Sequence, residues 1–575
     1  MEPRWIDDSL AIAGQLGAED FPRLAELGVR ELVCLRPDDE PGEYPSAAEV
    51  ARLAEAHGMR FVHAPVQGTD VTPEALDAIE AALAGTHERT LAYCRSGRRV
   101  AIAWSMVRVH RGEPAAEVLA SAAAHGFDLA ELAPGLTQEA VAAQRERTAR
   151  PGDPRDPDEP VPARVFDVVV VGGGSAGLGT IASLRKRSPG LAIALVEPSG
   201  EHHYQPGLTL VGNGWFDPER ITRREADLIP DGVSWYRSGA RRFDPDGDLV
   251  ELESGERLRY RTLVVATGLH LDFDGIAGAR EALGTNGVCC NYSPAHAPYT
   301  WEQVRALRGG RALFTQPPMP IKCAGAPQKA MYLACDRWRE RGVLGDVDVQ
   351  FHNAGGVLFG VEHFVPTLMK YVERYGADLH FGSRLVAIDG ADRIARFEQA
   401  DGEEGTKTTA VPFDFLHFVP PQKAPAAIAQ SPLADAAGWL EVDPHTLRHP
   451  RHGNVFGAGD VVGTTNAKTM AAARKHAPVV AENLLACLDG REPLMGYDGY
   501  GACPLTVERG RVVLAEFGYG GALMPTFPLA PEVPRYSQWV LKRHLMPWIY
   551  WDLMLKGREW FAEPRPLGSL VPQTA

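Results

Sequence analysis

The chain has 575 residues, more than one hydrophobic core usually supports, and this length indicates roughly three or four domains. Its formal net charge of -15 and its lack of a Lys/Arg run exclude nucleic acid as a partner, because phosphate binding needs concentrated positive charge. The eight cysteines form neither a C-x-x-C motif nor a zinc-like pattern with histidines, which excludes a disulfide scaffold and predicts no structural metal. The first thirty residues show no export signal, so we expect a cytoplasmic location.

Residues 1–149 alternate between strand-like and helix-like segments, which predicts a small α/β domain. The strand-like segments are ELVCLRP, FVHAPV and TLAYC, and the helix-like ones are SAAEVARLAEAHG, TPEALDAIEAALAG and AAEVLASAAAHG. TLAYC ends at Cys94, and a loop containing Arg95 and Gly97 leads into a predicted helix with Arg99. Loop N–H groups, the helix terminus and the arginines would all stabilise a thiolate.

Two chemistries remain open for this cysteine loop. Cys94 and Arg99 are spaced C-x4-R, which resembles the rhodanese-type CRxGxR loop that holds a persulfide, whereas dual-specificity phosphatases use C-x5-R. The upstream segment HAPVQGTDVTPEAL resembles a phosphatase general-acid loop, with Asp70 as the candidate acid. As a whole the domain is similar to small bacterial phosphatase-like sulfur transferases that occur fused to persulfide-metabolising partners. We expect sulfur transfer, and phosphatase activity is the alternative.

A proline-rich linker is predicted at residues 150–164. The segment RPGDPRDPDEPVPARV has five prolines and almost nothing apolar to bury, so it favours an extended conformation.

The segment FDVVVVGGGSAGLG after the linker predicts a strand, a glycine turn and a helix that bind a dinucleotide. The first glycine allows the tight turn, the second lets a pyrophosphate approach, and the third lets the helix pack on the strand. The next strand ends in Glu197, where a carboxylate can accept hydrogen bonds from a ribose diol. The candidate turn residues are Gly172, Gly174, Ser175, Ala176 and Gly177.

Two further strand-then-glycine segments, TLVVATG and NVFGAGD, follow in the order seen in the FAD-binding disulfide-reductase superfamily. This resemblance implies FAD as cofactor and implies that Asp460 holds the ribityl chain. It also suggests that HYQPG and the AKT of 467–469 contact the isoalloxazine. The other candidate cofactor residues are Gln205, Thr267, Gly268, Gly459, Lys468 and Thr469.

The second dinucleotide site expected in NAD(P)H-dependent relatives is replaced. The strand-like RALFTQPPMP leads into IKCAGAPQKAMYLACDRW, where prolines and Cys323 stand in place of the glycine turn. Proline lacks the N–H donors that a pyrophosphate needs, so the sequence predicts poor NAD(P)H binding. A cysteine at the start of a helix and close to Lys322 and Lys329 has a lowered pKa, which predicts a reactive thiol at Cys323.

Residues 164 to 560 resemble sulfide:quinone oxidoreductases of the kind that includes the mitochondrial enzyme. The motifs are KCAGAPQKAMYL, GYGACPLTVERGRVVLAEFGYG, NYSP and LMPWIYWDLMLKG. The resemblance implies that Cys323 and Cys503 form the redox pair beside the flavin. Hydrosulfide would attack their disulfide, or a version bridged by an extra sulfur. Electrons would then pass through the flavin to quinone, and sulfur would leave on a small thiol or sulfite. The family offers no role for Cys289 and Cys290.

The segment 535–575 predicts an amphipathic tail at a membrane surface. Four tryptophans and two tyrosines lie among basic residues between 535 and 561 of an otherwise acidic chain. Charges recur too often for a transmembrane span, so we expect peripheral attachment to the inner face of the cell membrane. The alternative is an aromatic core helix packed on the flavoprotein. The basic residues are Arg535, Lys542, Arg543, Lys556 and Arg558.

These patterns together predict an α/β protein with a phosphatase-like domain at 1–149, a linker at 150–164, a two-Rossmann flavoprotein at 165–534 and the tail at 535–575. Within the flavoprotein, FAD binding is assigned to 165–280 and 420–490 and the second Rossmann-like region to 281–419. The enzymatic alternative is an NADH:quinone reductase or another disulfide reductase joined to a phosphatase, and the non-enzymatic one is a thiol-based sulfide sensor. The sequence leaves the oligomeric state open, a homo-oligomer included.

Overall fold

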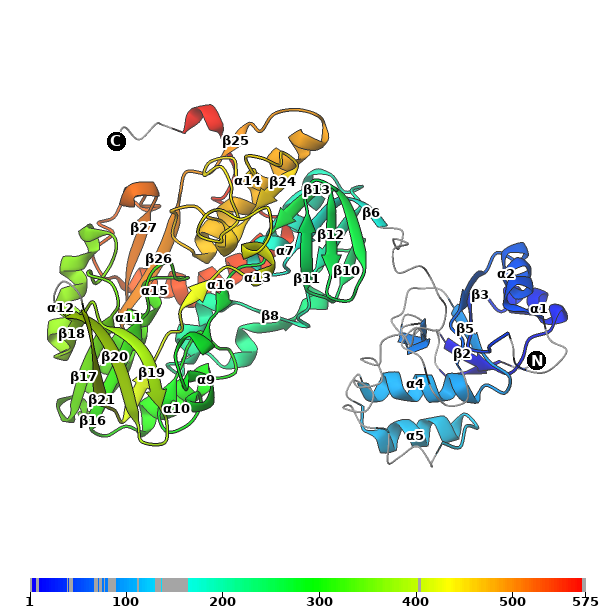
Figure 1. Ribbon diagram of the computed structural model, residues 1–575, viewed down its shortest axis with the longest axis horizontal. Helices are drawn as coiled ribbons and strands as arrows, with labels where there is room; N and C mark the ends of the chain where they lie inside the picture. Colours follow the sequence, from blue (N-terminus) through cyan, green and yellow to red (C-terminus); the bar gives the residue numbers. More distant parts are fainter. Residues whose placement is uncertain are drawn as a thin grey trace. The chain divides into compact units, whose positions relative to one another are not determined.

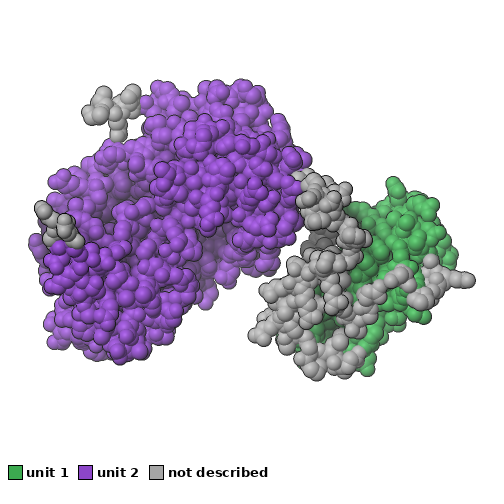
Figure 2. Space-filling model, in the orientation of Figure 1, with its two compact units in different colours: residues 1–159 green, residues 160–575 purple. Residues whose placement is uncertain are grey.

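The structure, a computed structural model, forms two compact units, residues 1–159 and 160–575 (Figure 2). Most of the predicted linker lies outside the described residues, and Arg164 begins the first strand of the second unit. The described residues are 3–6, 10–38, 40, 45–66, 71, 75–76, 78–80, 89–110, 113–129, 136, 164–401 and 405–570.

The first unit contains a five-stranded sheet in the order β1-β2-β5-β3-β4. Figure 1 labels β2, β5 and β3 of this sheet. All neighbouring strands pair in parallel except β1 and β2. Successive residues of β2 point to opposite faces of the sheet, and Leu10 and Ala11 belong to two different buried apolar clusters. The sheet is therefore buried on both faces. Most of the helix predicted at 72–85 lies outside the described residues. The bounds are β1 (Arg4–Trp5), β2 (Leu10–Ala13), β3 (Val29–Cys34), β4 (Arg60–His63), β5 (Arg89–Tyr93), α1 (Phe21–Glu26), α2 (Ala47–Ala56), α4 (Arg98–His110) and α5 (Ala115–Ala124).

A seven-stranded sheet carries the dinucleotide motifs of the second unit. Its order is β10-β7-β6-β13-β12-β11, with β24 paired to β13. Strands β10, β7, β6, β13 and β24 run parallel, so their carboxyl ends meet at one edge, where the glycine motifs follow. The bounds are β6 (Arg164–Val171), β7 (Ile193–Val196), β10 (Val233–Tyr236), β11 (Ala240–Asp244), β12 (Leu249–Leu252), β13 (Arg257–Val265), β24 (Val455–Gly457), α7 (Ser175–Arg187) and α14 (Met470–Leu488).

A second, parallel sheet in the order β15-β22-β16-β17-β18 forms the other Rossmann-like layer of this unit. Its helix α11 packs against the hairpin β26–β27, because Met331 and Leu505 belong to one buried apolar cluster. The bounds are β15 (Val288–Cys289), β16 (Gly310–Gln316), β17 (Val347–Asn353), β18 (Asp378–Phe381), β22 (Phe415–His417), β26 (Gly501–Glu508), β27 (Arg511–Phe517), α10 (Ala297–Ala306), α11 (Ala326–Glu340) and α12 (Val365–Tyr375).

Shorter elements complete the second unit, among them the antiparallel sheet β19-β20-β21. They are β8 (Glu201–His203), β9 (Thr222–Arg224), β14 (His270–Leu271), β19 (Arg384–Asp389), β20 (Ile394–Asp401), β21 (Gly405–Pro412), β23 (Gln422–Lys423), β25 (Met495–Gly496), β28 (Arg565–Pro566), α8 (Leu208–Val211), α9 (Ala279–Ala282), α13 (Ala426–Ala429), α15 (Tyr536–Val540) and α16 (Met546–Trp548).

The C-terminal segment, residues 536–562, winds through α15, α16 and irregular helical turns and packs on the flavoprotein core. Trp539, Tyr550 and Trp551 are buried in the apolar cluster that also contains α7 and α14. The alternative of an aromatic core element is therefore correct for these side chains. The segment also exposes a second set of large apolar side chains, so it is amphipathic as predicted. Within the described ranges, no helix is both long and apolar enough to cross a membrane. The exposed set is Tyr536, Val540, Leu545, Trp548, Trp560 and Phe561.

Candidate functional site

The glycine turn after β6 is shaped to leave room for a ligand. Gly172 has φ +107, and a Cβ on Gly177 would lie 1.8 Å from the Gly172 carbonyl oxygen. Both positions therefore need glycine for the turn and for the packing of α7. A Cβ on Gly174 would meet nothing within 4 Å, so the N-terminus of α7 faces open space beside Ser175. This open cradle fits a pyrophosphate.

Glu197 lies beside the same turn at the end of β7. Its carboxylate accepts hydrogen bonds from the backbone N–H groups of Gly173 (2.7 Å) and Ser199 (2.7 Å). The predicted ribose carboxylate is thus fixed by the backbone next to the turn.

The ends of β13 and β24 bring the other two glycine motifs to this edge of the sheet. The buried hydroxyl oxygen of Thr267 makes no hydrogen bond with the described residues, and a Cβ on Gly268 would meet nothing within 4 Å. Gly459 has φ +79 and lies against Ala176. Burial raises the pKa of Asp460, and the charge of Lys468 opposes that rise. An unpaired buried hydroxyl and open space at these motifs are consistent with a flavin dinucleotide.

The remaining predicted cofactor residues connect this sheet to the cysteine loop. Lys468 donates to the carbonyl oxygen of Asp460 (2.7 Å) and lies over the Trp439 ring, and burial lowers its pKa to about 8. Thr469 caps α14 by accepting from Ala472 N–H (3.3 Å). The Gln205 side-chain oxygen accepts from Lys322 Nζ (2.5 Å), one residue before Cys323.

Cys323 and Cys503 are 180 residues apart in sequence, and their sulfur atoms lie 3.5 Å apart. Cys323 is in the turn before α11, three residues earlier than the first helical residue, and Cys503 is on β26. A movement of about 1.5 Å would bring the sulfurs to the usual S–S bond length of about 2.05 Å. A Cβ on Gly325 would lie 2.6 Å from the Cys503 sulfur, so glycine at this position lets the strand approach the turn.

Lys329 supplies positive charge to this sulfur pair. Its Nζ lies 3.0 Å from the Cys323 sulfur and 3.9 Å from the Cys503 sulfur. A hydrogen bond from Cys503 lowers the pKa of Cys323 well below its usual value; burial opposes this, and the charge of Lys329 adds to it. The same hydrogen bond, together with burial, raises the pKa of Cys503. The two thiols therefore differ, and Cys323 is the one that ionises more readily.

The backbone of Cys323 is held in a conformation that is rare for cysteine. Its φ is +51, and such left-handed positions cost roughly 1 to 3 kcal/mol outside glycine. Three contacts maintain it: Cys323 N–H donates to the Lys468 carbonyl (2.8 Å), Ala326 N–H donates to the Cys323 carbonyl (2.7 Å), and the Tyr292 hydroxyl lies 3.5 Å from that carbonyl. These contacts fix the backbone of Cys323 in the left-handed conformation.

Lys542 is a site residue that the sequence pattern does not reveal. We expected it among the interfacial cations of the tail, and that expectation is wrong, because Lys542 is 4% exposed. Its Nζ donates to Thr506 Oγ1 (2.5 Å) and to the Pro504 carbonyl (3.2 Å), on the strand of Cys503. Burial, followed by the charge of Lys329, lowers its pKa. Sequence spacing gives no signal for this contact.

The cysteine loop of the first unit gathers positive charge around a carboxylate. Cys94 is buried at the end of β5, and Gly97 has φ +82, packed against Phe127. Arg99 donates to both carboxylate oxygens of Glu40 (2.6 and 3.0 Å). The predicted general acid Asp70 lies outside the described residues.

Arg95 and Arg36 also approach this carboxylate, at 3.8 Å and 3.5 Å from Glu40. The hydrogen bond from Arg99 lowers the pKa of Glu40. The Glu40 carboxylate is therefore the anion that pairs with the arginines beside the loop. The sequence spacing did not predict this role for Glu40.

Two protein-family models match the chain, one in each unit. Residues 2–110 match the phosphatase-like domain of beta-lactamase hydrolase-like proteins, and residues 166–301 match the pyridine nucleotide-disulphide oxidoreductases. A dinucleotide turn in a unit that matches this family indicates an oxidoreductase with a flavin-type cofactor.

Curated relatives identify the particular family. A mitochondrial sulfide:quinone oxidoreductase of Mus musculus is 34% identical over 392 residues, which are 68% of this chain and 87% of the relative. Its counterpart in Dictyostelium discoideum is 37% identical over 402 residues, 69% of this chain and 88% of the relative. The chain belongs to the sulfide:quinone oxidoreductase family, which confirms the predicted resemblance.

A solved structure confirms the predicted fold class. The sulfide:quinone oxidoreductase of Aquifex aeolicus matches with a TM-score of 0.57 at 21% identity, covering 70% of this chain and 96% of the other. The phosphatase-like fold of the first unit is confirmed by its family model.

Proposed function

We propose that the second unit oxidises sulfide to sulfane sulfur at Cys323 and Cys503 and passes the electrons through FAD to a quinone. The observation that carries this proposal is the buried sulfur pair, 3.5 Å apart, with Lys329 3.0 Å from Cys323. The curated relatives are sulfide:quinone oxidoreductases over the same part of the chain.

From the charge distribution we propose a role for each sulfur. Hydrosulfide attacks Cys503 in the oxidised pair, so that Cys503 becomes a persulfide and Cys323 leaves as a thiolate. Lys329 favours this direction because it lies closer to Cys323 and stabilises the leaving thiolate. A small thiol or sulfite then takes the outer sulfur from Cys503. Two reduced cysteines remain, and their return to the disulfide releases two electrons.

FAD would be held by the glycine turn at Gly172 and Gly174, by Glu197 and by the motif around Asp460. When bound, FAD supplies the two-electron acceptor that links the thiols to quinone. The turn residues would position the pyrophosphate through backbone N–H groups, and Glu197 and Asp460 would provide acceptors for hydroxyl groups.

The test of this function is anaerobic addition of hydrosulfide to the purified flavoprotein. We expect the flavin absorption to be lost within the mixing time and to return when a soluble quinone is added. NADH should leave the absorption unchanged, because Pro317, Pro318 and Pro320 stand where a pyrophosphate would need N–H donors. Bleaching by NADH but not by hydrosulfide would favour the NADH:quinone reductase alternative.

For the first unit we propose sulfur transfer through Cys94. The C-x4-R spacing and the cationic loop suit a persulfide, and the flavoprotein would supply sulfane sulfur at high effective concentration through the linker. An anionic sulfur donor would compete with Glu40 for Arg99, because that carboxylate occupies both terminal guanidinium nitrogens.

Full-length protein carrying Cys323→Ser isolates the activity of the first unit from that of the flavoprotein. In this background we expect transfer of sulfur from thiosulfate or glutathione persulfide, and we expect Cys94→Ser to reduce it at least about 100-fold because the sulfur-carrying thiol is gone. Cys487→Ser, which alters a thiol outside both sites, is the control. Hydrolysis of p-nitrophenyl phosphate without sulfur transfer would contradict this assignment.

We propose that the C-terminal segment attaches the protein to the inner face of the cell membrane, where quinone is available. The support is its exposed apolar set, in which Trp548 is 46% and Leu545 37% exposed. Deletion of 535–575 is a poor test, because it also removes buried Trp539 and Tyr550.

The double variant Leu545→Glu with Trp548→Glu should weaken flotation with anionic lipid vesicles at least about tenfold. Two carboxylates would replace apolar side chains, and carboxylates are unfavourable at an anionic lipid surface. The flavin content should stay unchanged. Val357→Glu, at a side chain that is 62% exposed elsewhere on this unit, is the matched control. Equal flotation of the double variant would contradict attachment through this segment.

A further inference from the structure

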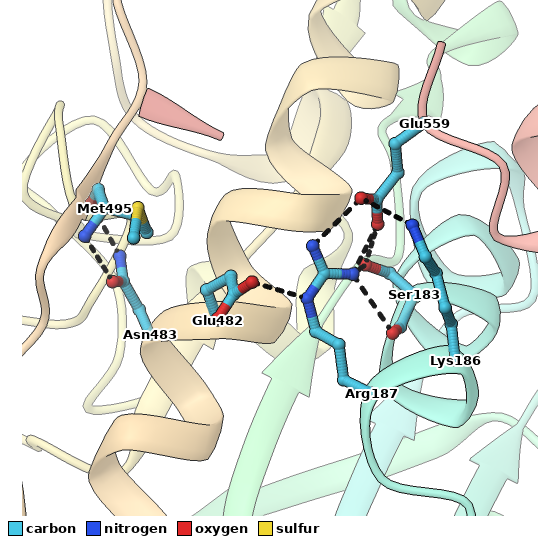
Figure 3. A network of polar contacts seen from close by, with 7 residues as sticks. All are labelled: Ser183, Lys186, Arg187, Glu482, Asn483, Met495 and Glu559. Atoms are coloured by element: carbon cyan, nitrogen blue, oxygen red, sulfur yellow. Dashed lines mark hydrogen bonds and ion pairs between the residues drawn. The ribbon is translucent and has the colours of Figure 1, made fainter. Parts of the chain in front are cut away.

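The C-terminal segment is tied to both ends of α7, the helix that begins at the cofactor turn. At the far end, Glu559 accepts hydrogen bonds from Ser183 Oγ (2.6 Å) and from Arg187 (2.5 and 2.9 Å), and Lys186 lies 3.3 Å away (Figure 3). Arg187 Nε donates a further hydrogen bond to the Glu482 carboxylate of α14 (2.7 Å). The Glu559 side chain is largely buried, so its contacts hold the C-terminal segment against the end of α7.

The C-terminal segment also lies very close to α7 at two glycines, Gly557 of the segment and Gly179 of the helix. A Cβ on Gly557 would lie 2.6 Å from the Ala182 carbonyl oxygen, and one on Gly179 would lie 3.1 Å from the Met554 methyl group. The segment therefore lies directly on α7 along its length.

At the near end, Tyr550 of the segment contacts the cofactor turn itself. Its hydroxyl group hydrogen-bonds to Ser175 Oγ (2.8 Å), the first residue of α7, and to His202 Nε2 (2.5 Å). His202 Nδ1 donates in turn to the Glu225 carboxylate (2.9 Å). Tyr550, His202 and Glu225 are all essentially inaccessible to solvent. A relay of four side chains thus runs from a buried carboxylate to Ser175.

The Glu225 carboxylate has one oxygen that this relay does not use. Its Oε1 is buried and has no hydrogen-bond partner among the described residues. It would lie 2.4 Å from a Cβ on Gly173, so it sits directly beneath the glycine turn. Burial raises the pKa of Glu225, and the hydrogen bond to His202 opposes the rise. An unsatisfied acceptor at 1% exposure is costly, and its position points to a donor brought by the ligand or by the ligand-bound turn.

We propose that Tyr550, aligned by His202 and Glu225, positions the Ser175 hydroxyl group for the cofactor pyrophosphate, so that flavin retention and docking of the C-terminal segment stabilise each other. Tyr550 is a positioning residue, because it acts through Ser175. Fixing that hydroxyl group before the ligand arrives removes an ordering cost from binding. The coupling is reciprocal by linkage, so bound FAD must protect the segment. This inference rests on FAD being the cofactor.

The test compares FAD affinity with protease sensitivity in the full-length protein. In the wild type we expect FAD to slow tryptic cleavage after Arg543 and Lys556. In Tyr550→Phe we expect the FAD dissociation constant to rise about tenfold, because the hydroxyl group that holds Ser175 is lost, and we expect FAD no longer to change the cleavage rate. Ser175→Ala should behave in the same way, and the double variant should lose no more than either single one.

Glu559→Gln is the matched control, because it loosens the far anchor and leaves Ser175 and Tyr550 in contact. Its cleavage should be faster overall, but FAD should still slow it by the wild-type factor. If Tyr550→Phe and Ser175→Ala bind FAD as tightly as wild type and keep the FAD-dependent protection, the inference is overturned while the proposed function stands. If the wild type takes up no FAD, the proposed cofactor fails and this inference fails with it.

Discussion

Cys323→Ser is expected to abolish sulfide-dependent quinone reduction while FAD stays bound. Serine cannot form the disulfide that hydrosulfide attacks, and its hydroxyl group does not ionise near neutral pH. We expect turnover to fall at least about 1,000-fold, as when a nucleophile is removed from other enzymes. The measurement is quinone reduction with hydrosulfide, together with the flavin absorption of the purified variant.

Cys503→Ser should have the same effect, because each sulfur needs the other at 3.5 Å. The two variants should differ in one respect. Cys503→Ser keeps Cys323 beside Lys329, and its new hydroxyl group can donate to Cys323 in place of the lost thiol, so this variant should show more thiolate absorption in the ultraviolet at neutral pH than Cys323→Ser. Cys335→Ser, at a buried thiol inside α11, serves as the control and should keep most of the activity. Full activity in Cys323→Ser would refute the assignment of the pair.

Lys329→Met should slow the reaction and change its pH dependence. The hydrogen bond from Cys503 would remain, but the charge of Lys329, which lowers the pKa of Cys323, would be lost. An opposite charge at this distance lowers a pKa by about 1 to 3, so we expect an activity loss of about 10- to 1,000-fold near neutral pH. The variant should recover as pH rises, because deprotonation of Cys323 then no longer needs the lysine. Steady-state rates between acidic and alkaline pH measure this.

The wild type should show a smaller rise with pH, because the hydrogen bond from Cys503 and the charge of Lys329 lower the pKa of Cys323. Lys370→Met, at an exposed lysine on α12, removes the same charge from a distant surface and should leave the pH profile unchanged. A Lys329→Met profile that runs parallel to the wild type at all pH values would contradict an electrostatic role for this lysine.

The cofactor turn could be predicted from the sequence because its determinants are local. Gly172, Gly174 and Gly177 act within one turn, and their spacing alone specifies the bend, the open approach and the helix packing. The parallel order of β6, β13 and β24 then places three such motifs at one edge of the sheet. For the same reason the replacement of the second turn by prolines was visible without a structure.

The thiol site depends on contacts that no local pattern encodes. Family resemblance, not spacing, paired Cys323 with Cys503, because the hairpin β26–β27 reaches α11 only in the folded unit. Lys542 looked like a surface cation because its neighbours are charged and aromatic, yet it is buried against β26. Tyr550 likewise gave no sign of contact with a turn 375 residues earlier.

The position of Lys542 has a consequence for the newly made chain. Residue 542 is made after Cys323 and Cys503, so a growing chain holds both thiols before it holds the Lys542 side chain, which donates to Thr506 and Pro504 on the strand of Cys503. The strand of Cys503 therefore gains these two hydrogen bonds only after the C-terminal segment has been made and has docked.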